Sequence, residues 1–154
     1  MLQRPQTLLL ITAVALLVTS LFLPIWQINT QHLNFTLTAF NSTSTLSGQE
    51  PNSRNLVYMG FLVVFAIIGG IYTITKYNNR SLQMKLCSVV NLLIGAHLIL
   101  FMMMVIPAAQ KEVQLEGSIS WGFFLPIGAF VLNLIAKLFI RKDDNLIKSV
   151  DRIR

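Results

Sequence analysis

Charged residues and cysteine are both scarce in this chain of 154 residues. Asp, Glu, Lys and Arg together make up 12% of it, against about 25% in an average soluble domain. Cys87 is the only cysteine, so the chain can form no internal disulfide and has no dithiol redox motif. Phosphate-binding loops and dinucleotide-binding fingerprints are absent as well. The scarcity of charge is typical of membrane proteins, and the lone cysteine excludes an oxidoreductase that shuttles disulfides.

Four long apolar runs fill most of the chain. Each has about the length that a helix needs to cross roughly 30 Å of hydrocarbon at 1.5 Å per residue. We predict an all-α membrane protein in which four transmembrane helices form an antiparallel bundle over residues 1–142. The predicted spans cover residues 7–26, 55–76, 85–107 and 119–140. The first run lacks a small-x-small cleavage site, so we expect a retained span rather than a signal peptide.

Basic residues predict the direction of insertion. The net charge of +6 would on its own suggest a nucleic-acid partner. Only Arg54 and Lys111 lie on one side of the predicted bundle, however, and the other ten Lys and Arg lie on the opposite side. Those ten are Arg4, Lys76, Arg80, Lys85, Lys137, Arg141, Lys142, Lys148, Arg152 and Arg154. By the positive-inside rule both termini are cytoplasmic, and the charge reflects contact with membrane lipids rather than with nucleic acid.

Residues 27–54 form the one sizeable soluble segment, which we expect on the extracytoplasmic side. Leu33, Phe35 and Leu37 alternate with polar residues, a pattern that predicts a β-strand with one apolar face. The stretch 41–52 is rich in Ser, Thr, Gly and Pro and is typical of a turn or flexible loop. The segment is therefore expected to be a small outer loop, with a short β-hairpin as one form of it.

Residues 143–154 form the cytoplasmic tail. Asp143 or Asp144 can cap a new helix, and apolar residues recur after them at helical spacing. We predict a short amphipathic tail helix that is mostly basic. The candidate interaction residues are Arg141, Lys142, Lys148, Arg152 and Arg154.

A few polar residues lie inside the predicted spans. Asn91 is six residues from Lys85 and Asn133 is eight from Arg141, so both lie about 9–12 Å from the charged boundary. The candidate polar layer consists of Thr12, Asn91, His97 and Asn133. Hydrogen bonds between helices are the expected role of the amides, and a site for a polar ligand or ion is the alternative.

His97 lies near the middle of the third span, where an ionisable residue is a functional hypothesis by default. No second intramembrane His or carboxylate accompanies it, so a metal site or proton chain lacks other members. The three methionines at 102–104 lie on the same helix and so are unable to close over a haem bound to His97. We therefore predict no catalytic, metal or cofactor site, no small-molecule substrate and no enzymatic activity.

Three stretches together resemble a known family: Met1–Leu8, Phe22–Trp26 and Ile140–Arg154. The pattern is similar to the four-span membrane proteins of Bacteroidetes grouped as domain of unknown function 4293. The resemblance implies a multi-pass protein of the bacterial inner membrane and supplies no activity.

Two functions remain. The first is a structural or interaction subunit whose cytoplasmic tail contacts lipid or a protein partner. The alternative is a small oligomeric transporter or channel that uses the polar layer of Asn91, Asn133 and His97.

Overall fold

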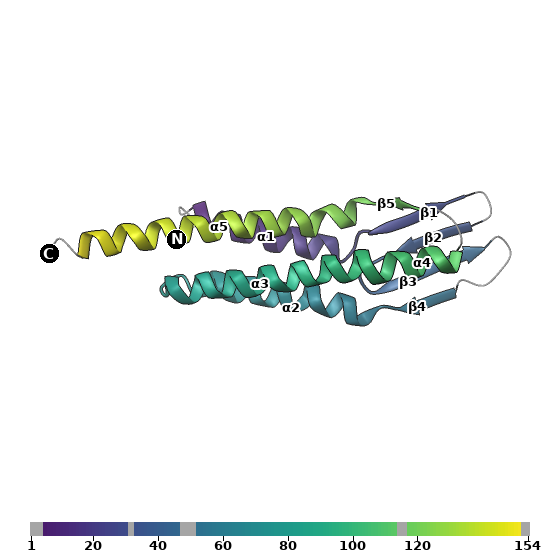
Figure 1. Ribbon diagram of the computed structural model, residues 1–154, viewed down its shortest axis with the longest axis horizontal. Coiled ribbons are helices and arrows are strands. Elements are labelled where there is room, and N and C mark those ends of the chain that lie inside the picture. The colour runs from purple at the N-terminus through teal and green to yellow at the C-terminus, as the bar shows by residue number, and fades with distance from the viewer. Residues whose placement is uncertain (1–4, 31–32, 47–51, 114–116, 152–154) are drawn as a thin grey trace.

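The computed structural model describes residues 5–30, 33–46, 52–113 and 117–151. Helices pack side by side at one end of an elongated molecule, and an antiparallel sheet lies at the other (Figure 1). The helices are α1 Pro5–Ser20, α2 Val57–Thr75, α3 Arg80–Leu100, α4 Ile106–Val113 and α5 Trp121–Asp151, with a π-helical segment, Phe101–Val105, between α3 and α4. We refer to the end that carries Lys76, Arg80, Lys85, Arg141 and Lys142 as the basic end, and to the opposite end as the sheet end.

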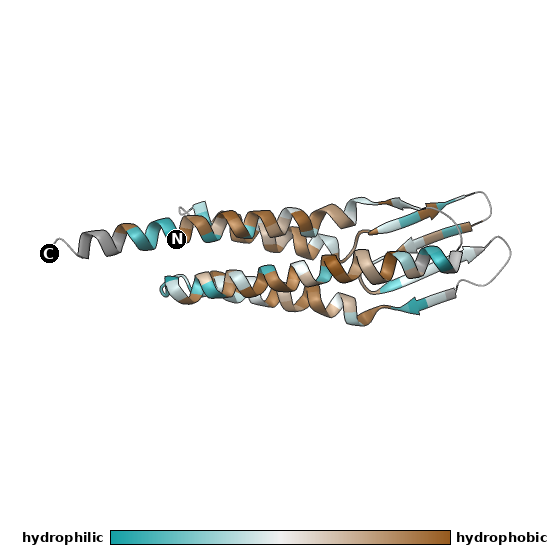
Figure 2. Cartoon of the chain, viewed as in Figure 1, coloured by the Kyte–Doolittle hydropathy of each residue, from teal (hydrophilic) through white to brown (hydrophobic). Residues whose placement is uncertain are grey.

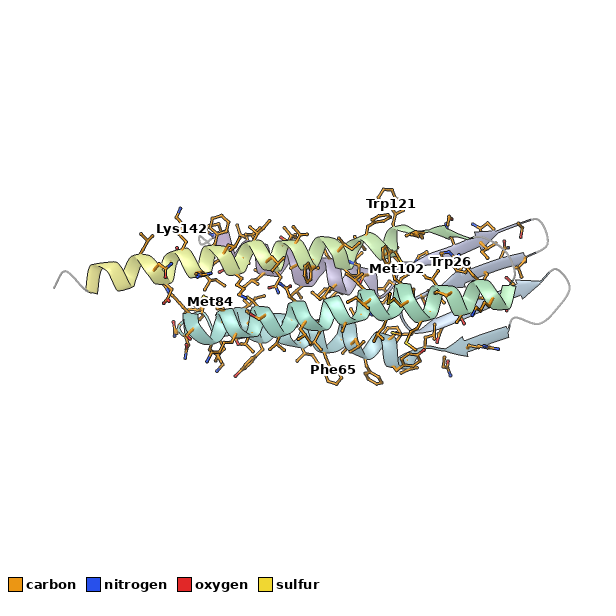
Figure 3. All side chains as sticks on the ribbon, in the orientation of Figure 1. Trp26, Phe65, Met84, Met102, Trp121 and Lys142 are labelled. Atoms are coloured by element: carbon orange, nitrogen blue, oxygen red, sulfur yellow. The ribbon has the colours of Figure 1, made fainter. Side chains whose placement is uncertain are left out.

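Three of the described helices are long and apolar enough to cross a membrane: Val57–Thr75, Arg80–Ala108 and Trp121–Leu146. Hydrophobic residues predominate along these helices (Figure 2), and Phe65 stands away from the other helices (Figure 3). Leu92 and Leu138 are likewise exposed. Because so much exposed apolar surface is unfavourable in water, the helices are consistent with those of a multi-pass membrane protein.

Helix α1 is shorter than the sequence predicts. It ends at Ser20 rather than at Trp26, and its 16 residues correspond to about 24 Å. The amides of Leu21 and Phe22 bond to carbonyls three residues earlier, which tightens the last turn. Pro24 follows and is unable to continue the helix. The chain then enters the sheet at Trp26.

Five strands are described: β1 Trp26–Asn29, β2 Leu33–Leu37, β3 Asn41–Leu46, β4 Asn52–Asn55 and β5 Ser118–Ile119. Their order is β4-β3-β2-β1-β5, with antiparallel pairing throughout. The strand predicted from the alternation around Phe35 is confirmed as β2. The prediction of a turn or loop over residues 41–52 is wrong for residues 41–46, because β3 pairs along the length of β2. Threonine is a good strand former, and Thr36 and Thr43 hydrogen-bond across the pair at 2.6 Å.

The apolar side of this sheet closes the sheet end of the helices. Trp26 and Phe35 meet edge to face with ring centroids 5.5 Å apart. They belong to one buried cluster with Met59 of α2, Phe101 of the π-helical segment and Phe123 of α5. The outer segment is therefore part of the folded core rather than a separate loop.

Pro107 does not end the third long helix, although the sequence predicts that it does. The chain passes through the π-helical segment and continues in α4 to Val113. The amide of Ile106 bonds to the carbonyl of Phe101, a step of five residues. Since a proline ring crowds the carbonyl four residues earlier, a wider turn just before it lets the helix go on.

Helix α5 also continues where a new helix is predicted. It runs without a break from Trp121 to Asp151 and passes the α2–α3 turn at the basic end (Figure 1). No Gly or Pro occurs after Gly128, so nothing in the sequence ends the helix near Asp143 or Asp144. The predicted tail helix is thus the last part of α5.

Candidate functional site

The structure brings together two of the four residues of the predicted polar layer. Asn133 on α5 donates from Nδ2 to Asn91 Oδ1 on α3 at 2.8 Å and to the carbonyl of Cys87 at 2.9 Å. Both asparagines are buried, as is Cys87. Small neighbours allow this approach, because Ala129 and Ala136 flank Asn133 at helical spacing and are fully buried.

Thr12 does not join this pair. It lies on the exposed side of α1, and its hydroxyl donates to the carbonyl of Leu8 at 2.9 Å in its own helix. The buried face of α1 is made by Leu10, Ala13 and Leu17. The position of Thr12 along the chain predicts its depth in the bundle, but depth does not determine which face of a helix a residue occupies.

His97 lies apart from the asparagines, closer to the sheet end. It is six residues beyond Asn91, or about 9 Å along α3. Its side chain is 2% exposed and lies against α2 near the backbone of Met59, and its ring centroid is 5.6 Å from that of Phe101. His97 Nδ1 is buried without a hydrogen-bond partner among the described residues.

Four buried side-chain atoms of the described residues have no hydrogen-bond partner, and all four lie on α3. They are Arg80 Nη1, Gln83 Oε1, Asn91 Nδ2 and His97 Nδ1. Buried polar groups are nearly always paired, so α3 is the element on which an additional partner would be expected. Within the described part of the chain, no three His, Cys, Asp or Glu side chains cluster so as to hold a metal ion.

Comparison with known proteins adds the family. A model described as Domain of unknown function (DUF4293) matches residues 2–153. The chain belongs to the DUF4293 family. The resemblance noted in the sequence is thereby confirmed at the level of the family. No curated protein matches the chain.

The DUF4293 match extends to residue 153 and so includes the basic extension of α5. Arg141 and Lys142 lie on the described, exposed surface of this extension; Lys142 marks the basic end in Figure 3. Lys148 lies within α5, but its side chain is outside the described part. Arg152 and Arg154 lie outside the described residues.

Two polar contacts near the basic end were not predicted. Lys137 Nζ on α5 donates to Ser88 Oγ on α3 at 2.8 Å. Gln83 Nε2 on α3 donates to the carbonyl of Thr73 on α2 at 3.3 Å, and both side chains are 1% exposed. The spacing along each helix was a signal for the contact between Lys137 and Ser88. Ser88 precedes Asn91 by three residues and Lys137 follows Asn133 by four, so each lies on the same helix face as its asparagine.

Proposed function

We propose that this DUF4293 protein spans a bacterial inner membrane with four helices and has both termini in the cytoplasm. The charge distribution supports this orientation, because Arg54 and Lys111 are the described basic residues of the sheet end. Helix α1 alone is too short for 30 Å of hydrocarbon, but the apolar residues Leu21–Ile25 extend its reach toward the sheet.

The proposed role is that of an interaction subunit, without catalytic activity, that presents the end of α5 to a cytoplasmic protein partner. The continuity of α5 carries this proposal. Its 31 residues correspond to about 46 Å, some 15 Å more than the hydrocarbon is thick. A straight extension leads away from the membrane surface, so only its base, at Arg141 and Lys142, lies at headgroup level. The family match across this extension is further support.

A helix break beyond the membrane tests this role. Asn145→Pro interrupts the exposed extension without changing its charge, and Asn145→Ala is the matched control. After cross-linking in intact membranes, proteins captured by the wild type and by Asn145→Ala should be lost from Asn145→Pro. Identical capture by all three forms would refute a docking role for the extension.

A second candidate is a small oligomeric transporter or channel. The observation that favours it is the buried Asn91–Asn133 pair together with His97, whose Nδ1 is unpaired within the described residues. Proton flux into vesicles that contain the full-length protein should be lost in His97→Leu and kept in Thr12→Val. No flux with the wild type would remove this candidate.

A further inference from the structure

The first turn of α3 carries two polar groups that have no hydrogen-bond partner among the described residues. Arg80 is the first residue of α3 and Gln83 is one turn later, so their side chains leave the same face of the helix. The turn is fixed by Asn79, whose Oδ1 accepts from the amide of Leu82 at 3.1 Å and whose carbonyl accepts from the amide of Gln83 at 2.9 Å.

Each of the two groups lacks a partner among the described residues. Gln83 Nε2 is engaged by the carbonyl of Thr73, which holds the amide between α2 and α3 and leaves Oε1 buried and unpaired. Arg80 Nη1 is also buried and unpaired, although the rest of the Arg80 side chain is partly exposed. A cationic donor and a neutral acceptor therefore lie on one face of the first turn of α3, where the Arg80 side chain is partly exposed.

We propose that Arg80 and Gln83 bind the headgroup of a phosphatidylglycerol molecule. A guanidinium pairs with phosphate through two parallel hydrogen bonds, and the first amides of a helix also favour an anion. The glycerol of the same headgroup carries hydroxyl donors that suit Gln83 Oε1. The Arg80 guanidinium disfavours a second cationic group beside it, such as ethanolamine. This site is independent of the proposed partner at the end of α5.

The other basic residues of this turn serve as controls. Lys85 is exposed and follows Gln83 by two residues, so it leaves a different face of α3. Lys76 is occupied over the ring of Tyr72, with Nζ 5.1 Å from its centroid. If lipid were held only by general positive charge, Lys85 would contribute as much as Arg80.

Native mass spectrometry of the full-length protein, titrated with phosphatidylglycerol or phosphatidylcholine, tests the site. Arg80→Gln should weaken binding of phosphatidylglycerol about tenfold, whereas Lys85→Gln should leave it unchanged. Gln83→Leu should reduce the preference for phosphatidylglycerol over phosphatidylcholine about fivefold, because the choline headgroup has no hydrogen-bond donor. Should Arg80→Gln not fold, Arg80→Lys keeps the charge, loses the planar fork and should still weaken binding.

Two results would overturn the proposal. Equal weakening by Arg80→Gln and Lys85→Gln would indicate diffuse attraction to the basic end. Displacement of the lipid by inorganic phosphate alone would indicate a site for a soluble phosphate compound rather than for a lipid headgroup.

Discussion

Asn133 is the residue of the asparagine pair to substitute first, because its side chain donates both hydrogen bonds to α3. Asn133→Leu deletes them and leaves the amide of Asn91 buried without a partner, so we expect a loss of about 1–2 kcal/mol in the free energy of unfolding. The double variant with Asn91→Leu should be more stable than Asn133→Leu, since no amide is then left unpaired. Unfolding in mixed detergent micelles measures these values.

Thr12→Val is the matched control for this cycle, because the Thr12 hydroxyl bonds only within α1. It should leave the free energy of unfolding unchanged. If Thr12→Val destabilised the protein as much as Asn133→Leu, the contribution of the pair would be refuted.

At the scale of residues, position along the chain predicted well how deep a residue lies in the bundle, but predicted poorly which face of its helix it occupies. Asn91 and Asn133 were predicted at nearly the same depth, and in the structure their side chains are hydrogen-bonded. Thr12 was assigned a similar depth but lies on the outward face of its helix. Lipid and protein interiors are similarly apolar, so hydrophobicity does not mark the buried face of a membrane helix. Gln83 was missed for a related reason, since polar residues near a charged boundary are ordinary there.

At the scale of elements, the presence of a helix or strand was easier to predict than the residues at which it ends. The apolar runs predicted helices at the right places, and alternation around Phe35 predicted β2. The ends were displaced because tertiary contacts override local signals. Pro107 is accommodated by a π turn whose residues Phe101 and Val105 pack on the sheet. Strand β3 exists because β2 offers it a partner, a pairing that composition alone does not reveal.

Close packing between helices explains why α2 carries adjacent glycines. A Cβ at Gly70 would lie 2.7 Å from Val14 Cγ2 of α1, and one at Gly69 would lie 3.0 Å from Val90 Cγ2 of α3. Each glycine therefore serves a different neighbour, and α2 is held close to both.

Across the whole molecule, the four-span proposal depends on α1 crossing the membrane. If it does, Pro5 and Asn145 share one side and Asn29 lies on the other. The native thiol of Cys87 is fully buried and gives little background, so single cysteines at these three exposed positions can be labelled with an impermeant maleimide. In intact cells whose outer membrane has been made permeable, we expect Asn29→Cys to react. Pro5→Cys and Asn145→Cys should react only after the inner membrane is opened.

Labelling of Pro5→Cys together with Asn29→Cys in those intact cells would refute the four-span arrangement and leave three spans. Labelling of Asn145→Cys instead of Asn29→Cys would reverse the orientation. The expected pattern follows from charge, because moving the basic end across the membrane would carry Lys76, Arg80 and Lys85 through hydrocarbon, whereas the sheet end presents few basic residues. The short α1 is compatible with crossing because the sheet, through Trp26, is buried in one cluster with Phe101 and Val105 of the π-helical segment, which continues into α4. The outer boundary of the membrane would then lie beyond the end of α1 but within the longer helix Arg80–Ala108.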